Sequence, residues 1–249
     1  MLSKGQIKYV RQLEQKKFRV REGVFVAEGP KVVGDLMDCG FRPLQLYATG
    51  QWRHDDAGFD VQHTLVTDDE LRKLSFLQHP QQVLAVFPLP RPSAVSPSPQ
   101  HLYLALDGVQ DPGNLGTIIR IADWFGISAI FCSADTADAW NPKVVQATMG
   151  SIARVPLYYC DLEALLGQTG LPVYGTLLDG EDIYGQELSA GGIIVMGNEG
   201  NGISAPVRRL VNRRLLIPAY RQGAESLNVA IATAITCAEF RRRTPHSRP

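Results

Sequence analysis

Short apolar runs alternate with longer polar and glycine-containing segments between residues 101 and 241, and this alternation restricts the fold more than any other feature. Each run has four or five residues, which suits a β-strand and is too short for a buried helix. The runs are nearly free of polar side chains, as is typical of parallel strands buried on both faces. We therefore predict a parallel α/β sheet. Its strands are expected at residues 102–106, 129–132, 173–177, 193–196 and 214–217, with helices after Asn114, Asn141, Ser204 and Ser226, the last extending to about Arg241.

A proline-rich segment separates this region from the first part of the chain. Residues 88–99 contain five prolines among twelve positions and no apolar period, which is typical of a semi-rigid linker. Before it, Thr67 and Glu70 have the spacing of a capping box that begins a short helix. Strands are predicted at residues 23–27, 44–48 and 83–87, and helices near the N-terminus and at 31–37. The predicted organisation is a small three-layer α/β domain at residues 1–87, a linker at 88–99 and a larger domain at 100–249.

The composition excludes several classes of protein. Hydrophobic residues make up 45% and charged residues 20% of the 249 residues, which is ordinary for a globular protein. No apolar run approaches the roughly 18 to 20 residues that cross a bilayer, and the first residues lack the apolar core of a secretory signal. We therefore expect a cytoplasmic protein with no membrane partner. The four cysteines are scattered without a C-x-x-C pair, so we expect reduced thiols and neither a metal site nor a disulfide framework.

Basic residues are concentrated near the N-terminus, although the whole chain has no net charge. Between residues 4 and 21, seven basic side chains accompany one acidic side chain, a local net charge of +6. Ile7, Val10 and Leu13 recur at helical spacing among them, so an apolar stripe lies opposite a basic face. Such a face can bind nucleic acid, although a solvated helix face explains the pattern as well. The candidate RNA-binding residues are Lys4, Lys8, Arg11, Lys16, Lys17, Arg19 and Arg21.

Polar side chains follow three of the predicted strands, at the sheet edge where open α/β sheets bind their ligands. In the first of these segments, Asn114 and Arg120 lie six residues apart on one predicted helix, within two turns of each other. Arg120 stands among apolar residues, where a guanidinium needs a carboxylate or a phosphate as its partner. The segment is a candidate anion site, although an arginine that holds a loop through an ion pair explains it equally well.

The second segment reads GNEGNG at residues 197–202, directly after a predicted strand. Its three glycines allow the backbone to approach a flat ligand closely, and Glu199 can hold the loop or a ligand amine. The glycine spacing differs from the G-x-G-x-x-G of dinucleotide-binding domains, and the ribose-binding acid expected about 20 residues further on is absent. A nicotinamide cofactor is therefore excluded.

The third segment places Ser226 and Asn228 at the start of the last predicted helix. Both side chains can cap the free amides of a helix N-terminus. The same amides can instead hold an anionic group, such as the carboxylate of a methionine moiety. The residues of this segment do not decide between the two interpretations.

Taken together and in this order, the three segments resemble the signature motifs of the SpoU (TrmH-type) branch of the SPOUT methyltransferases. They read DPGNLGTIIRIADWFG at residues 111–126, IIVMGNEGNGIS at 193–204 and LLIPAYRQGAESLNVAIATAI at 215–235. The resemblance covers residues 101–241 as a catalytic domain. The sequence SKGQIKYVRQLEQKKFRVREGVFVAEGPKVV at residues 3–33 is similar to the RNA substrate-binding domain that precedes the catalytic domain in many members.

The resemblance implies a fold and a reaction that periodicity does not reveal. Members transfer a methyl group from S-adenosylmethionine to a ribose 2′-hydroxyl of structured RNA, and the two-domain layout favours ribosomal RNA over transfer RNA. Members are homodimers, need no metal, and contain a deep trefoil knot, a rare exception to the rule against knotted chains. By motif position, the implied cofactor-binding residues are Thr176, Leu177, Met196, Gly197, Ile217 and Leu227, and the implied catalytic residues are Arg120, Asn114, Glu199, Ser226 and Asn228.

The resemblance also implies what each catalytic residue does. Arg120 is assigned to the reacting ribose and its phosphate, and Asn114 and Asn228 to the orientation of ribose or cofactor. Glu199 braces the glycine-rich loop, and Ser226 caps the helix that faces the site. Two alternatives remain open: a non-catalytic RNA-binding or ribosome-assembly protein that keeps the fold, and a SPOUT enzyme that methylates a base nitrogen. An α/β-hydrolase is excluded because the sequence contains no G-x-S-x-G motif.

Overall fold

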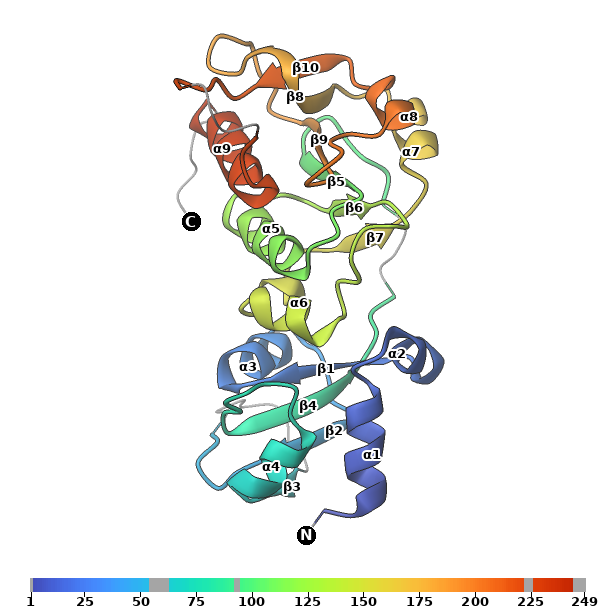
Figure 1. Ribbon diagram of the computed structural model, residues 1–249, viewed down its shortest axis with the longest axis vertical. Helices are drawn as coiled ribbons and strands as arrows, with labels where there is room; N and C mark the ends of the chain where they lie inside the picture. The colour runs from blue at the N-terminus through green and yellow to red at the C-terminus, as the bar shows by residue number, and fades with distance from the viewer. Residues whose placement is uncertain (1, 54–62, 92–94, 222–225, 244–249) are drawn as a thin grey trace. The chain divides into compact units, whose positions relative to one another are not determined.

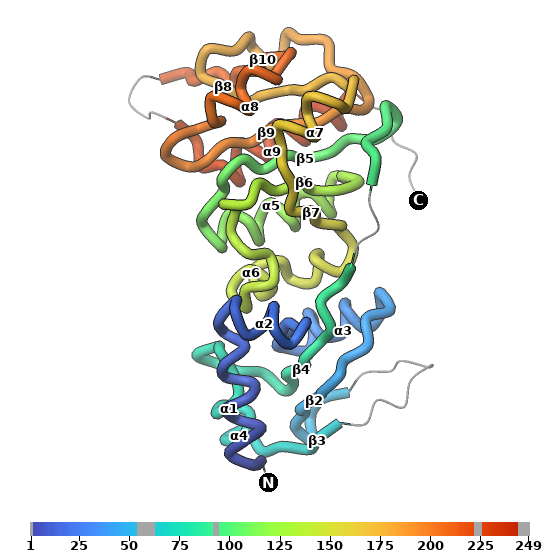
Figure 2. The backbone as a smooth tube through the Cα atoms, turned by 90° about the vertical axis from the view of Figure 1, so that its right-hand side faces the viewer, coloured from blue at the N-terminus to red at the C-terminus, as the bar shows by residue number. Residues whose placement is uncertain are grey.

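The computed structural model describes residues 2–53, 63–91, 95–221 and 226–243, and the chain divides into two compact units. Unit 1 contains residues 1–91 together with 138–154, and unit 2 contains residues 92–137 together with 155–249 (Figures 1 and 2). The chain thus leaves unit 2 at residue 138 and returns to it at residue 155. Residues 92–94, within the predicted linker, lie outside the described residues.

Unit 1 is built on a four-stranded sheet in the order β1-β4-β2-β3. β4 is antiparallel to both β1 and β2, whereas β2 and β3 are parallel. The strands are β1 (Val24–Glu28), β2 (Gln45–Ala48), β3 (Thr64–Leu65) and β4 (Val83–Pro88), and the helices are α1 (Lys4–Gln12), α2 (Lys16–Glu22), α3 (Pro30–Asp38) and α4 (Asp68–Leu74). Side chains alternate along β1, so Val24 and Val26 pack with Val10 on one face while Phe25 stacks on Phe87 on the other. The capping box of Thr67 and Glu70 begins α4, as predicted.

The N-terminal basic segment forms two helices, and this changes the position of one predicted RNA-binding residue. α1 begins at a capping box of Ser3 and Gln6. Arg19, in α2, is only 2% exposed. Its guanidinium donates hydrogen bonds to the carbonyls of Leu13 (2.7 Å) and Glu14 (2.6 Å) and forms an ion pair with Asp138. Arg19 therefore holds the turn between the two helices instead of facing solvent, and we remove it from the candidate RNA-binding set.

Residues 138–154 complete unit 1 although they come from the middle of the sequence predicted as the second domain. They contain α6 (Pro142–Ala147) and the short 3-10 helix η1 (Ser151–Ala153). Asn141 caps α6 as predicted, since its side chain accepts a hydrogen bond from the Lys143 amide (2.9 Å). The Trp140 ring lies 4.6 Å from the Phe25 ring, so this segment covers β1. Helices thus lie on both faces of the sheet, which gives the three layers expected from the sequence.

Unit 2 is built on a six-stranded sheet in the order β10-β8-β9-β5-β6-β7, and every strand pairing in it is parallel. Figure 1 shows α5 and α9 side by side on one face, while α7 and α8 lie on the other. The strands are β5 (Leu102–Asp107), β6 (Ile130–Cys132), β7 (Leu157–Tyr159), β8 (Val173–Asp182), β9 (Gly192–Gly197) and β10 (Arg213–Leu216), and the helices are α5 (Pro112–Trp124), α7 (Leu162–Gln168), α8 (Ala205–Arg208) and α9 (Val229–Arg242).

The parallel α/β architecture predicted from the apolar runs is confirmed, with local differences at the ends of elements. β8 continues well beyond the predicted strand, to Asp182, and α9 begins at Val229 because Asn228, not Ser226, caps it. β5 and β9 pair in register up to Asp107 and Gly197, so the first two motif segments start side by side. The trefoil knot stays a prediction, because strand order alone does not define a knot. Within the described residues, no helix is long and apolar enough to cross a membrane.

Candidate functional site

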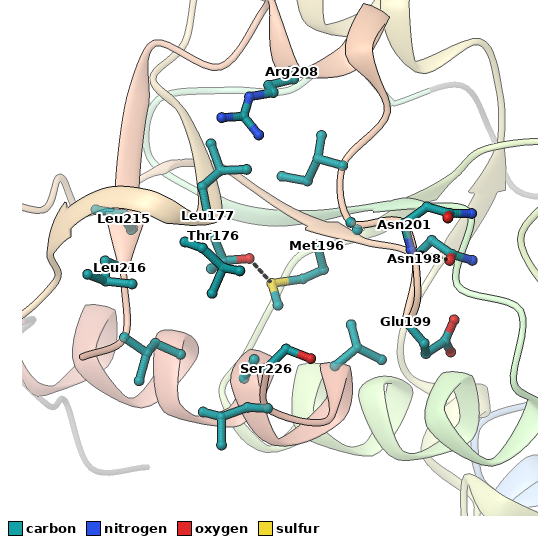
Figure 3. A pocket seen from close by; sticks show the side chains of 18 of the residues that line it. Thr176, Leu177, Met196, Asn198, Glu199, Asn201, Arg208, Leu215, Leu216 and Ser226 are labelled. Carbon is teal, nitrogen blue, oxygen red and sulfur yellow. Dashed lines mark hydrogen bonds between the residues drawn. The ribbon is translucent and has the colours of Figure 1, made fainter. Parts of the chain in front are cut away.

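A cavity of about 560 Å³ lies in unit 2 where the carboxyl ends of β8, β9 and β10 meet the beginning of α9 (Figure 3). It brings together residues that are distant in sequence. Eight of the residues implied by motif position line it: Thr176, Leu177, Met196, Gly197, Glu199, Ile217, Ser226 and Leu227. Motif position did not single out the other lining residues, which are Leu178, Asp179, Asn198, Gly200, Asn201, Gly202, Ile203, Arg208, Leu215, Leu216, Val229 and Ala232.

The glycine-rich segment forms a closed turn on one wall of the cavity. The backbones of Asn198 and Gly202 exchange two hydrogen bonds of 2.9 Å, and Gly202 has a φ of +69°, which favours glycine. A Cβ atom on Gly197 would lie 2.3 Å from the carbonyl carbon of Gly202. The turn therefore excludes a side chain at Gly197 by its own backbone contacts, before any ligand is considered.

Asn198 fixes this turn to the segment that follows β5. Its side-chain oxygen accepts hydrogen bonds from the amides of Gly200 (2.9 Å) and Asn201 (3.0 Å). Its side-chain nitrogen donates to the carbonyl of Gly108 (2.7 Å). One side chain thus satisfies two amides within the turn and a carbonyl outside it, and it sets where the turn lies relative to β5.

Glu199 connects the same turn to the beginning of α5. Its carboxylate accepts hydrogen bonds from the Gln110 amide (3.2 Å), the Asp111 amide (3.2 Å) and the Asn114 side chain (3.0 Å). Partial burial opposes ionisation, but these bonds and one from its own backbone outweigh it and lower the pKa of the Glu199 carboxyl. Glu199 is therefore ionised at neutral pH and acts as an acceptor that joins the two loops.

Asn114 and Asn228 extend this hydrogen-bond chain to α9. The Asn228 side-chain nitrogen donates to the Asn114 side-chain oxygen (2.9 Å). The Asn228 oxygen caps α9 by accepting from the amides of Ala230 (2.9 Å) and Ile231 (3.3 Å). Neither asparagine lines the cavity, so in this structure they position the loops that do.

The opposite wall of the cavity is mainly apolar. Figure 3 shows Thr176 and Met196 facing each other, with the Thr176 hydroxyl 3.4 Å from the Met196 sulfur. The same hydroxyl donates to the Val195 carbonyl (3.3 Å). Leu177, Ile217 and Leu227 add aliphatic surface. The cavity thus combines an apolar wall with a polar wall that carries Glu199 and Ser226.

Arg120, an implied catalytic residue, has no partner among the residues that the structure describes. It is exposed on α5, makes no hydrogen bond or ion pair with a described residue, and does not line the cavity. Arg241 of α9 lies just beyond the C-terminal end of α5, where its guanidinium donates to the carbonyls of Phe125 and Gly126 (both 2.6 Å). Arg120 therefore remains free to contact a group supplied by another molecule.

An ion cluster at the edge of the cavity was not predicted. Arg208 of α8 and Arg214 of β10 both pair with the same oxygen of Asp179, in β8. Figure 3 shows Arg208 on the side of the cavity opposite Glu199 and Ser226. No local pattern in the sequence indicates this cluster, because its three members come from separate elements. Within the described residues, no group of histidine, cysteine, aspartate and glutamate could hold a metal ion.

In unit 1, the predicted RNA-binding residues other than Arg19 have exposed side chains. Lys17 and Arg21 both lie 4.9 Å from the Phe18 ring, and Arg11 lies 5.1 Å from the Phe76 ring. A cation is attracted to the face of an aromatic ring, so these contacts favour fixed positions for the three charged groups. The exposed set is Lys4, Lys8, Arg11, Lys16, Lys17 and Arg21.

Comparison with known proteins places both parts of the chain. The model of the SpoU rRNA methylase family matches residues 101–238, and the model of the MRM3-like substrate binding domain matches residues 4–85. The chain is similar to the 23S rRNA (guanosine(2553)-2′-O)-methyltransferase RlmP of Bacillus subtilis, with 32% identity over 92% of this chain and 93% of that protein.

Two solved structures are similar over nearly the whole chain. One is a putative RNA methyltransferase of the TrmH family from Porphyromonas gingivalis, with 42% identity, a TM-score of 0.86, and coverage of 98% of this chain and 100% of that chain. The other is an AdoMet-bound rRNA methyltransferase from Sinorhizobium meliloti, with 31% identity, a TM-score of 0.86, and coverage of 99% and 97%. Both units are therefore matched in fold by these proteins.

Proposed function

Because the chain belongs to the SpoU rRNA methylase family, we propose that unit 2 carries out methyl transfer at the cavity described above and that unit 1 binds the RNA substrate. The chain is an S-adenosylmethionine-dependent RNA 2′-O-methyltransferase. The observation that carries the assignment of the site is the cavity itself, since it gathers six residues from the second and third motif segments together with Thr176 and Leu177 of β8.

The cavity fits S-adenosylmethionine in size and in the chemistry of its walls. Its volume of about 560 Å³ is within the usual range of small-molecule pockets. Thr176, Leu177, Met196, Ile217 and Leu227 would hold the adenosine against apolar surface and backbone. Ser226 and Glu199 on the polar wall would face the charged methionine part. When bound, S-adenosylmethionine supplies a methyl group on a sulfonium, which is already an activated donor.

The chain itself contributes mainly by aligning the ribose 2′-hydroxyl with the methyl donor. Orientation of two reacting groups can supply roughly 7 to 11 kcal/mol of a reaction barrier. Glu199, Asn114 and Asn228 form the hydrogen-bond chain that fixes the motif loops to one another. Arg120 would contact the reacting ribose and its phosphate and stabilise the charge that develops on the 2′-oxygen as its proton leaves.

We propose ribosomal RNA as the substrate and the cytoplasm as the place of action. The similarity to RlmP extends over both units, and the name of that relative specifies a guanosine 2′-hydroxyl of 23S rRNA. The exposed basic side chains of unit 1 provide the phosphate contacts that any structured RNA requires.

We also propose that the active form is a homodimer in which α5 and α9 form the contact. Trp124 on α5 is 84% exposed, and Ile231 on α9 is 52% exposed. Leu227, just before α9, is 48% exposed. Large apolar side chains exposed on one helix pair are typical of an oligomer contact. A partner on this face would bring a second Arg120 close to it.

The proposed function is tested by the chemistry of the product. Purified protein is incubated with S-adenosylmethionine carrying a labelled methyl group and with rRNA from cells that lack this protein, and the RNA is digested to nucleosides for mass analysis. The expected result is one 2′-O-methylnucleoside, at a position that is unmethylated in the deletion strain and methylated in its parent. A label on a base nitrogen, or binding of RNA without transfer, would favour the alternative functions.

A further inference from the structure

Unit 2 has a negative net charge although its substrate is a polyanion. Unit 2 contains ten arginines, no lysine and thirteen acidic residues, so its net charge is −3. An RNA substrate must nevertheless reach the cavity in this unit. Because phosphate contacts supply much of the affinity for nucleic acid, cations near the cavity decide where RNA can approach it.

Three of these arginines are engaged elsewhere. Arg241 caps α5, and Arg242 and Arg243 bind the Glu239 carboxylate. By contrast, four arginines fall within seven residues of α8 and β10, and we call them the arginine cluster: Arg208, Arg209, Arg213 and Arg214. Arg209 and Arg213 make no ion pair or hydrogen bond through their side chains with any residue that the structure describes.

Two members of the cluster pair with a single acidic residue. One oxygen of Asp179 pairs with both Arg208 and Arg214. Each guanidinium has five N–H donors, so most of the donors of this pair remain available for a phosphate. Arg208 and Arg214 are 40% and 50% exposed, which leaves their outer faces open to solvent.

The position of the cluster connects it to the reaction site. Arg208 lines the cavity, and Arg214 directly precedes Leu215 and Leu216 of β10, which also line it. Two neighbouring acids of β8 form no ion pair with a described arginine: Glu181 accepts a hydrogen bond from Gln186, and Asp182 accepts one from the Tyr184 amide. The cluster is therefore a group of exposed cations immediately beside the mouth of the cavity.

We propose that the arginine cluster binds phosphates of the RNA strand on either side of the methylated nucleotide, and that Asp179 partly offsets the positive charge of Arg208 and Arg214 there. The inference rests on the proposed function and adds a second RNA-binding surface, in unit 2, to the basic residues of unit 1. Arginine suits this task because its planar fork binds phosphate through two N–H groups at once.

The test removes cluster charges that do not line the cavity. The double variant Arg209→Gln, Arg214→Gln is titrated with a 23S rRNA transcript over a salt series. Each lost phosphate contact reduces the slope of log K against log salt by about 0.7 to 0.9 and, near 0.15 M salt, weakens binding several-fold. We expect a slope reduction of about 1.4 to 1.8 and roughly ten-fold weaker binding or more. A matched control, Arg53→Gln with Arg242→Gln, removes two charges elsewhere and should keep the wild-type slope.

A second variant should strengthen RNA binding instead of weakening it. Asp179→Asn removes the acid that offsets the cluster, so RNA binding should become several-fold tighter. If the three charges only stabilise the fold, the same variant would lower the unfolding temperature and leave RNA affinity unchanged or weaker. If the double variant keeps the wild-type slope and affinity, the proposal is wrong, and an acidic protein would be the better candidate for a partner of this face.

Binding of S-adenosylmethionine by the wild type is measured separately by calorimetry. A failure of the proposed function would appear in that measurement and not in the salt series.

Discussion

Glu199 acts as a fixed anion between two loops. The amides of Gln110 and Asp111 precede the first turn of α5, where free N–H groups and the helix dipole favour a negative charge. This environment explains why the carboxyl is ionised although it is partly buried, and why its lowered pKa does not make it a proton acceptor for the ribose hydroxyl at neutral pH. Removal of the hydroxyl proton must therefore depend on another group.

Arg120 is the residue whose removal should affect chemistry without affecting the cofactor. Because it does not line the cavity, Arg120→Ala should leave the Kd for S-adenosylmethionine within a few-fold of wild type while methyl transfer is lost. The measurement pairs calorimetry with a single-turnover assay at saturating RNA. Arg120→Lys serves as the control, since it keeps the charge but loses the planar fork. Near-normal turnover by the alanine variant would remove Arg120 from the reaction.

Asn198 should affect the cofactor more than the chemistry. Asn198→Ala leaves two amides of the turn and the Gly108 carbonyl without their partner, at a cost of about 1 to 2 kcal/mol. A turn that is less well fixed should bind S-adenosylmethionine about 5- to 30-fold more weakly, with kcat at saturating cofactor nearly unchanged. Asn198→Asp keeps the acceptor for both amides and should bind the cofactor better than the alanine variant. Equal affinities for wild type and alanine variant would show that the turn is fixed without this side chain.

At the scale of elements, the predictable strands are those with continuous apolar sequence. β5 and β9 were predicted from continuous runs of apolar residues. The structure explains these runs, because the central residues of both strands are buried. β7 was missed because it has three residues, one of them exposed, and β3 because its two residues are both exposed. The burial of Arg19 could not be predicted, because its partner Asp138 lies 119 residues away.

In the candidate site too, some residues could be predicted from sequence motifs and others could not. Met196, Gly197 and Glu199, which belong to one motif segment, line the cavity because this segment follows β9, whose end is fixed by the parallel sheet. Arg208 and Asp179 carry no motif, and they meet only because α8 and the extended end of β8 fold against each other. Contacts of this kind depend on tertiary structure and have no periodicity in the sequence.

The end of α9 should respond to acid in a predictable direction. Hydrogen bonds from Arg242, together with those from Arg243, lower the pKa of Glu239 from its usual 4.5 to about 2. Because the folded state binds this proton less tightly, Glu239 stabilises the fold above pH 4.5, and the stabilisation is lost as the pH falls towards 2. Glu239→Gln should therefore lower the free energy of unfolding at pH 7, and its difference from wild type should shrink below pH 4.5. Urea unfolding across this range tests it, with the exposed Glu187→Gln as control; a constant difference at all pH values would contradict the ionic role.

The exposed face of α2 should contribute to RNA affinity and not to catalysis. Replacing Lys16, Lys17 and Arg21 by alanine removes three exposed charges, so the slope of log K against log salt should fall by about 2 to 3 while cofactor affinity is unchanged. Arg19→Ala is the contrasting variant, because loss of a buried ion pair partner should lower stability by about 3 kcal/mol or more. A wild-type salt slope in the triple variant would place the RNA contact of unit 1 on another face.

At the scale of the whole molecule, the two units are not two consecutive pieces of sequence. Residues 138–154 leave unit 2 and pack with β1 and α3, where Gly150 has a φ of +95° and lies so close to Asp35 that a Cβ atom would clash. A fragment that begins near residue 98 would keep this segment but lose Phe25 of β1, which the Trp140 ring contacts. The substrate-binding part and the catalytic part are therefore coupled in folding, although each has its own sheet.

The proposed dimer leads to a prediction about which copy of Arg120 serves each cavity. Arg120 does not line the cavity of its own chain, whereas Glu199 does, so we expect a complete site to combine Glu199 of one copy with Arg120 of the other. Arg120→Ala and Glu199→Ala should each be inactive alone.

When these two variants are mixed and allowed to exchange subunits, every mixed dimer contains one site that lacks both groups and one that has both. About half of the dimers are then mixed, and activity should return to about a quarter of wild type. Native mass spectrometry measures the fraction of mixed dimers, and each variant exchanged with itself is the control. If Arg120 acts in its own chain, no mixed dimer contains an intact site. Absence of activity in a sample that contains mixed dimers would therefore assign Arg120 to the cavity of its own chain.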